Sequence, residues 1–318
     1  MLLDILYIII GVALVIWGAD RLTDGASSIA RRLNVPELVI GLTIVAAGTS
    51  APELFVSLMS ALKGTPDMAV GNVVGSNVFN TLLIVGVSAM VAPMSIMKST
   101  VLKDIPFTIG ASALLLIICM DGWQSLSISG NVISRLDGFW LLLGFAAFMI
   151  YTFSVAKTGH KASEKAVQTT PVWKGVVWVV IGLTCLIVGS NLFVDSAAQI
   201  ASLLGISEGI IGLTIVAGGT SLPELATSVV AAQKGQSAMA IGNVIGSNVY
   251  NILLILGVTA VISPMQIGGI TMIDLSVMLL SVVLVWLFSY TKYTVARWEG
   301  AVLTAFFTVY MGWLLYSI

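Results

Sequence analysis

Long hydrophobic runs, separated by short polar joints, follow one another along the whole chain. A transmembrane helix needs about 20 mostly apolar residues, and this criterion divides the chain into ten segments. The segments are 2–28, 36–61, 67–92, 99–120, 132–156, 172–199, 207–232, 238–263, 270–290 and 297–317. Several joints contain glycines typical of turns, such as Gly64, Gly205 and Gly235. The pattern predicts an all-α polytopic membrane protein with about ten transmembrane helices.

The composition supports a membrane location and narrows the range of partners. Of the 318 residues, 58% are hydrophobic and 9% are charged, and the mean hydropathy is +1.05. A chain this apolar cannot bury its surface within a water-soluble globule, so the lipid bilayer is its solvent. The net charge of −1, without a basic cluster, argues against nucleic acid. Cys119 and Cys185 lie in separate apolar runs, so we predict neither a disulfide nor a cofactor, and no obligate protein partner is evident.

An internal duplication relates the two halves of the chain. Residues 41–86 align without a gap to residues 212–257, a displacement of 171, and 30 of the 46 positions are identical. A polar linker, 157–171, separates the halves, which we place at 1–156 and 172–318. Each half holds five predicted spans, and an odd number makes the second half cross the membrane in the opposite sense. This is the inverted-repeat arrangement of secondary transporters.

The basic residues predict the orientation of the chain. With the N-terminus outside, 12 of the 14 lysines and arginines fall on or near the cytoplasmic side, and only Lys63 and Arg135 fall outside. We therefore expect a cytoplasmic linker and both termini outside. The small size favours a bacterial or archaeal plasma membrane.

Each half carries one glutamate deep in an apolar run, directly after a proline: Glu53 in GTSAPE and Glu224 in GTSLPE. Proline lacks the amide hydrogen that a helix needs, so both helices should break there. Backbone carbonyls freed at membrane depth are tolerated where they line a cavity, and there they bind cations. The apolar spans hold no basic partner for the two carboxylates, so we expect a cation to meet them.

Hydroxyl groups accompany both glutamates. Thr49 lies four residues before Glu53, and Thr220 four before Glu224, so each threonine could share a helical face with its carboxylate. Ser50 and Ser221 add further hydroxyls. Oxygen ligands without thiolate or imidazole suit Na⁺ or Ca²⁺ better than zinc or copper.

The span after each glutamate carries a polar stripe. Its members recur every four residues: Asn72, Ser76 and Asn80 in one half, and Asn243, Ser247 and Asn251 in the other. Residues at this spacing share one helical face, which can face the glutamates. A single amide in a membrane helix can equally bond a neighbouring helix, and we assign Asn72, Asn77, Asn243 and Asn248 to that class.

Other polar and small residues have simpler interpretations. The glycine pairs Gly71/Gly75 and Gly242/Gly246 indicate close helix packing. Asp20, Asp24, Asp195 and Asp274 lie near span ends, where interfacial solvation explains them, so we leave them outside the site.

At these motifs the sequence resembles the sodium/calcium exchanger family of the cation/calcium antiporter superfamily, especially its small prokaryotic members. The resemblance rests on AAGTSAPELFVS with GNVVGSNVFN and on AGGTSLPELATS with GNVIGSNVYN. It implies that ions bind among the second, third, seventh and eighth spans, and that the first and sixth spans slide to alternate access.

The resemblance also implies roles for individual residues. Glu53 and Glu224 would bind Ca²⁺ and share Na⁺, helped by Thr49 and Thr220, and Asn80 and Asn251 would occupy the centre. The separate Na⁺ sites would be completed by Ser50, Ser76, Ser221, Ser247 and the carbonyls of Ala46 and Ala217. Several branches of the family, including potassium-dependent exchangers, carry aspartate at the position of Asn251, which weakens the case for K⁺ co-transport.

We therefore interpret the protein as a secondary antiporter that exports Ca²⁺ in exchange for Na⁺ by alternating access. Proton or potassium coupling is the alternative within the superfamily, although proton-coupled members typically read GNATE where this chain reads GTSAPE. A cation channel is the alternative of another class, but channels usually place filters on a symmetric oligomer axis. An enzyme is disfavoured because no intramembrane catalytic motif is present.

Overall fold

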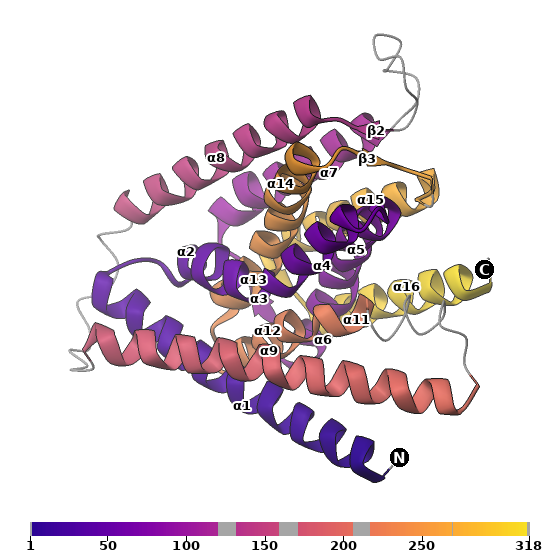
Figure 1. Ribbon diagram of the computed structural model, residues 1–318. Helices are drawn as coiled ribbons and strands as arrows, with labels where there is room; N and C mark the ends of the chain where they lie inside the picture. The colour runs from indigo at the N-terminus through magenta and orange to yellow at the C-terminus, as the bar shows by residue number, and fades with distance from the viewer. Residues whose placement is uncertain (1, 120–131, 159–170, 206–216, 269, 317–318) are drawn as a thin grey trace.

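The computed structural model describes residues 2–119, 132–158, 171–205, 217–268 and 270–316, and these residues are almost entirely helical (Figure 1). In the first half, the helices are α1 (Leu2–Leu33), α2 (Glu37–Ile40), η1 (Gly41–Val45), α3 (Ala46–Thr49), α4 (Ala51–Leu62), α5 (Pro66–Val78), η2 (Phe79–Ile84), α6 (Val85–Val91), η3 (Thr100–Asp104), α7 (Ile105–Cys119) and α8 (Arg135–Thr158). The segments named η are π-helical turns that continue directly into the neighbouring α-helices.

The second half repeats this order. Its helices are α9 (Val172–Leu203), α11 (Ala217–Thr220), α12 (Leu222–Gln233), α13 (Ser237–Val249), η6 (Tyr250–Ile255), α14 (Leu256–Ile262), α15 (Met272–Tyr290) and α16 (Arg297–Tyr316). Most of the predicted linker lies outside the described residues, so its boundaries stay a prediction. Cys119 and Cys185 are both free thiols, as the sequence predicts.

The predicted membrane spans are found in the structure. Among the described residues, eight continuous helical stretches are long and apolar enough to cross a membrane, and the bent stretch 37–62 makes a ninth. The remaining predicted span, 207–232, is the seventh along the chain; it is represented by α11 and α12, and residues 206–216 lie outside the described part. The fold is the predicted one: an all-helical, multi-pass membrane protein of two inverted repeats.

Helices α1 and α9 lie side by side in an antiparallel pair along one edge of the bundle (Figure 1). Small residues bring the two backbones together: a Cβ placed on Gly18 would lie 2.8 Å from the carbonyl oxygen of Gly182. The same contact recurs two turns away on either side, between Gly11 and Gly189 and between Gly25 and Gly175. Because α1 and α9 are equivalent helices of the two repeats, their antiparallel packing shows the inversion directly.

Both of these helices are longer than the sequence predicts. They continue to Leu33 and Leu203, beyond the predicted ends at 28 and 199. At 1.5 Å per residue, a helix of 32 residues is about 48 Å long, which exceeds the ~30 Å hydrocarbon core and requires a tilted crossing or a protruding end.

Two pairs of very short antiparallel strands join the repeats. Strand β1 (Met94–Ser95) pairs with β4 (Thr294–Val295), and β2 (Val132–Ile133) pairs with β3 (Met265–Gln266). β1 and β3 are equivalent positions 171 residues apart, and each pairs with a strand of the other repeat. The sequence does not predict these strands, because two-residue bridges leave no alternating pattern.

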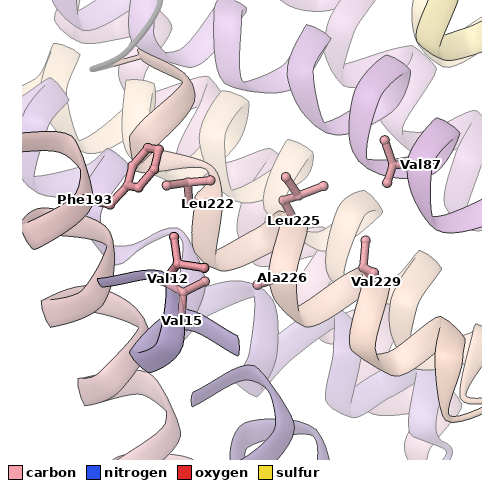
Figure 2. Close-up of a pocket in the computed structure, with 8 residues that line it drawn as sticks. All are labelled: Val12, Val15, Val87, Phe193, Leu222, Leu225, Ala226 and Val229. Carbon is pink, nitrogen blue, oxygen red and sulfur yellow. The ribbon is translucent and has the colours of Figure 1, made fainter. Parts of the chain in front are cut away.

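An apolar cavity of about 290 Å³ lies where the α1/α9 pair meets the rest of the bundle (Figure 2). Val12 and Val15 of α1 and Phe193 of α9 line one side, and Leu222 and Leu225 of α12 are among the residues opposite. This part of the boundary between the pair and the core consists of hydrocarbon side chains.

Candidate ion-binding site

Both helices that carry a glutamate are broken just before the proline, as predicted. The first break lies at Ser50, between α3 and α4, where the axis of the stretch bends by 46°. The second lies at Ser221, between α11 and α12, and the backbone angles of the two serines nearly coincide (φ −84°, ψ 8° and φ −91°, ψ 6°). Proline cannot donate the hydrogen bond that would close the helix at this point.

The break places each glutamate in the first turn of a new helix. Glu53 and Glu224 occupy the third position of α4 and α12 respectively. A helix N-terminus carries partial positive charge and stabilises a nearby anion. This helps to hold two carboxylates that are 0% and 1% exposed.

The two repeats exchange hydrogen bonds at these carboxylates. Ser50 Oγ donates to Glu224 Oε1 (3.0 Å), and Ser221 Oγ donates to Glu53 Oε1 (3.2 Å). The glutamates therefore belong to one site at the interface between the repeats, with each half completing the coordination of the other's carboxylate. No lysine or arginine of the described chain forms an ion pair with either glutamate.

The structure places each threonine beside the glutamate of the other repeat. The Thr49 hydroxyl donates to the carbonyl of Val45 (3.1 Å) and contacts Asn243 Oδ1 (3.2 Å), and it lies within reach of Glu224. Thr220 lies likewise beside Glu53. The break at each serine interrupts the helical spacing on which the prediction depended.

The polar stripes of α5 and α13 face the glutamates, as expected. Ser247 Oγ lies 3.5 Å from Glu224 Oε1. Asn72 Nδ2 donates to the carbonyl of Glu53 (3.3 Å) and to Ser57 Oγ (2.9 Å). Asn243 makes the two equivalent bonds in the other repeat at the same distances. These two asparagines tie adjacent helices together, which fits their assignment to packing.

Asn80 and Asn251 lie in π-helical turns, which the sequence does not reveal. Asn80 Nδ2 donates to Asn248 Oδ1 (3.1 Å), and Asn251 Nδ2 donates to Asn77 Oδ1 (3.2 Å). All four side chains are 1% exposed. Asn77 and Asn248 therefore reach the site, although the sequence interpretation assigned them to packing. The sequence signal that could have identified them is their recurrence at the same position in both copies of the GSNV motif.

Close packing at the predicted glycine pairs is seen in the second repeat but not at Gly75 in the first. A Cβ on Gly246 would lie 2.6 Å from the Cβ of Ala46, and one on Gly242 would lie 2.8 Å from the carbonyl oxygen of Leu38, so this pair packs closely as predicted. Gly75 has no described atom within 4 Å of such a Cβ. The segment equivalent to 38–46 is 209–217, which lies largely outside the described residues.

Several buried oxygens around the glutamates have no hydrogen-bond partner among the described residues. They are Glu53 Oε2, Glu224 Oε2, Asn80 Oδ1, Asn251 Oδ1 and Ser76 Oγ. A buried polar atom without a partner is costly, and a buried unpaired carboxylate more so. Hard oxygens of this kind are the ligands that Ca²⁺ takes in proteins, and the two carboxylates balance its charge. The donor set fits Ca²⁺ and Na⁺ as transported substrates.

The predicted carbonyl ligands, those of Ala46 and Ala217, do not stand out as unpartnered oxygens in the way that the side-chain oxygens do. The carbonyl of Ala46 accepts the Ser50 amide at 3.0 Å and lies 3.5 Å from the Thr49 hydroxyl. Ala217 begins α11 in the equivalent position. Their roles stay predictions.

The family follows from a comparison of the whole chain with family models. The model described as "Sodium/calcium exchanger protein" matches residues 3–154 and 174–316. The chain belongs to the sodium/calcium exchanger family. This exchanger is therefore a multi-pass membrane antiporter for Na⁺ and Ca²⁺.

Individual relatives agree with this assignment. The exchanger is 41% identical to the putative antiporter CaxA of Alkalimonas amylolytica, covering 83% of this chain and 82% of the relative. It is 30% identical to the sodium/calcium exchanger MaX1 of Methanosarcina acetivorans, covering 98% and 99%. Its fold is similar to that of the sodium-calcium exchanger NCX_Mj, with a TM-score of 0.84, 33% identity and 98% of both chains covered.

Proposed function

We propose that this exchanger binds one Ca²⁺ between Glu53 and Glu224 and releases it when Na⁺ occupies the same oxygens. The observation that carries the proposal is the crossed pair of serine–glutamate hydrogen bonds, which makes the two carboxylates parts of one site. Binding the two ions at shared oxygens makes them competitors, so the site carries Ca²⁺ and Na⁺ in turn and not together.

The hydroxyls around the carboxylates supply the Na⁺ positions in this proposal. These ligands are Ser50, Ser76, Ser221 and Ser247, with the carbonyls of Ala46 and Ala217, while Thr49 and Thr220 assist the carboxylates. Asn80 and Asn251 contribute neutral oxygens at the centre, where their Oδ1 atoms are unpartnered among the described residues. With two formal negative charges the site balances Ca²⁺ without attracting K⁺ as well.

We place the exchanger in a bacterial or archaeal plasma membrane with both termini outside, where it exports Ca²⁺ by using the Na⁺ gradient. The distribution of lysine and arginine among the joints supports this orientation. Exchange of Ca²⁺ for more than two Na⁺ moves net positive charge with Na⁺, and each net charge is worth about 2.3 kcal/mol per 100 mV.

Purified protein in liposomes tests the proposal. Vesicles loaded with Na⁺ and diluted into Na⁺-free medium should take up Ca²⁺, whereas vesicles loaded with choline should not. An inside-positive potential should speed this uptake, because net positive charge leaves the vesicle with Na⁺, and an inside-negative potential should slow it. Uptake driven equally well by a proton gradient in the absence of Na⁺ would refute sodium coupling.

A further inference from the structure

The geometry points to Asn77 and Asn248 as positioning residues that turn the amide oxygens of Asn251 and Asn80 toward the transported ion. This inference rests on the proposed function and deepens it. Neither residue needs to touch the ion, since each acts through the asparagine of the other repeat.

A side-chain amide presents different chemistry at its two ends. Asparagine has one acceptor oxygen and a nitrogen that only donates, so a cation is attracted to one end of the amide and repelled by the other. An ion site built with asparagine therefore needs a second group that fixes the orientation. An aspartate would need no such group, because either of its oxygens can face the ion.

The structure supplies that second group in both repeats. Asn251 donates through Nδ2 to Asn77 Oδ1, and Asn80 donates through Nδ2 to Asn248 Oδ1. In each case the remaining Oδ1 of the donor is buried and has no partner among the described residues. The Nδ2 of Asn77 is itself held near Met278 Sδ at 3.8 Å, which keeps its oxygen toward Asn251.

The test is a crossed set of variants whose Ca²⁺ affinity is measured by equilibrium binding of radioactive Ca²⁺ to purified protein. Asn77→Ala and Asn248→Ala should each weaken binding by up to about tenfold, because one hydrogen bond contributes roughly 0.5–1.5 kcal/mol. In an Asn251→Asp background, Asn77→Ala should reduce Ca²⁺ affinity much less, while Asn248→Ala should reduce it by the full amount. In an Asn80→Asp background, Asn248→Ala should have the small effect and Asn77→Ala the full effect.

Asn72→Ala is the matched control, because its amide bonds Ser57 and the Glu53 carbonyl and orients no other amide. Asn72→Ala should reduce Ca²⁺ affinity by the same factor in the wild-type, Asn251→Asp and Asn80→Asp backgrounds. The inference would be overturned if the loss of Ca²⁺ affinity in Asn77→Ala and Asn248→Ala did not depend on the background. It would also be overturned if these two variants bound Ca²⁺ like wild type. Failure of the wild-type protein to bind Ca²⁺ would instead refute the proposed function.

Ion pairs join the α1/α9 pair to the core at one end of the bundle. Lys234, the residue that caps the C-terminus of α12, lies 2.7 Å from carboxylate oxygens of both Asp20 and Asp24 on α1. Its Nζ also donates to the backbone carbonyl of Asp20 (3.1 Å). One end of the bundle is therefore tied by charge to the α1/α9 pair.

The internal duplication places part of an equivalent set at the opposite end, where Asn191 stands at the position of Asp20. Displacement by 171 relates Lys63 to Lys234 and Asp195 to Asp24, and Lys63 caps α4 as Lys234 caps α12. Lys63 and Asp195 are both exposed, and neither forms an ion pair with another residue of the described chain. Of two equivalent contacts, only one is made.

We infer that Lys234 with Asp20 and Asp24, and Lys63 with Asp195, form two latches that close alternately. In a protein of inverted repeats, exchanging the conformations of the halves produces the state that opens to the other side. That state should contain the Lys63–Asp195 pair and lack the Lys234 pairs. Ion pairs that are partly exposed contribute little to stability, so each latch can open in every cycle.

Cysteine pairs test the latches in a Cys119→Ser, Cys185→Ser background reconstituted in liposomes. One variant carries Asp24→Cys with Lys234→Cys, and the other carries Lys63→Cys with Asp195→Cys. A short bifunctional maleimide is used as the cross-linker, because a disulfide spans only ~4–7 Å between Cα atoms. Each pair should cross-link, and each cross-link should stop Na⁺-driven Ca²⁺ uptake.

The decisive protein carries all four cysteines. Cross-linking one latch should prevent the other from reacting in the same molecule, as seen by peptide mapping. The mismatched pair Asp24→Cys with Lys63→Cys is the control and should not cross-link within one chain. Two results would overturn the proposal. One is a molecule that carries both cross-links. The other is a Lys63→Cys/Asp195→Cys pair that never cross-links under any Na⁺ or Ca²⁺ condition in which the Asp24→Cys/Lys234→Cys pair does.

Discussion

At the ion site the serine–glutamate hydrogen bonds between the repeats are made in both directions, whereas at the ends of the bundle only one of two equivalent contacts is made. Ser50 bonds Glu224 just as Ser221 bonds Glu53, at distances that differ by 0.2 Å (3.2 minus 3.0). Lys234, in contrast, pairs with α1, while its counterpart Lys63 is exposed. In our proposal the crossed bonds recur because both halves hold the same ion, and the ends differ because the two latches close alternately.

The largest effect should come from the carboxylates at the symmetric centre. Glu53→Gln and Glu224→Gln should each reduce Na⁺-driven Ca²⁺ uptake by more than about 100-fold, because a divalent ion would keep an uncompensated charge in a buried site. Both variants should remain monodisperse in detergent. Glu37→Gln, at the start of α2 and outside the site, is the control and should transport normally. Near-normal uptake by either site variant would exclude a paired-carboxylate site.

The crossed serines should have smaller and matching effects. Ser50→Ala and Ser221→Ala each remove one hydrogen bond to a charged group, which contributes roughly 1.5–3 kcal/mol, so Ca²⁺ affinity should fall about tenfold or more in each. The two losses should agree within about threefold because the contacts are equivalent. A strong effect in one repeat and none in the other would show that the site is less symmetric than the hydrogen bonds indicate.

Packing of the α1/α9 pair should affect stability more than ion affinity. A Cβ at Gly182 would lie 2.6 Å from the Leu22 amide nitrogen and 2.7 Å from the Gly18 carbonyl oxygen, so Gly182→Ala should destabilise the protein by about 1–3 kcal/mol. Thermal unfolding in detergent measures this. Gly110→Ala, in α7 and with no described atom within 4 Å of the added carbon, should be neutral or slightly stabilising.

The smallest expected effect is that of potassium. Asn80 and Asn251 are neutral, so the centre lacks a third carboxylate that could hold K⁺ beside Ca²⁺. Replacing K⁺ by choline should leave the initial rate of Na⁺-driven Ca²⁺ uptake unchanged. A rate that rises with K⁺ at zero membrane potential would show that neutral amides do not exclude K⁺ coupling.

Much of the fold could be predicted because membrane helices leave a strong signal in the sequence. Apolar runs located the spans, and the GTSAPE and GTSLPE motifs located both helix breaks, because a proline removes a specific hydrogen bond. The ends of α1 and α9 were predicted too short, since both helices extend past the apolar run. The two-residue strands depend on pairing between distant segments. The π-helical turns differ from α-helix only in the spacing of their hydrogen bonds, and the hydrophobic pattern does not show this difference.

The site was predicted less completely than the fold. Glu53, Glu224 and the serines were identified from their repetition, but the bonds between repeats were not, because sequence spacing describes only neighbours on one helix. For the same reason, the spacing did not show that Thr49 and Thr220 lie beside the glutamate of the other repeat. Asn77 and Asn248 were assigned to packing because a buried asparagine gives no sign of which atom it contacts.

We propose that the two halves build one Ca²⁺ site that Na⁺ shares, and equilibrium ion binding to the purified protein is the measurement that decides this. Radioactive Ca²⁺ should bind at one ion per chain, and Na⁺ should displace it competitively, raising the apparent dissociation constant without changing the number of sites. Binding of two Ca²⁺ per chain, with one site lost in Glu53→Gln and the other in Glu224→Gln, would contradict the account. So would Na⁺ that lowers the number of Ca²⁺ sites without changing their affinity.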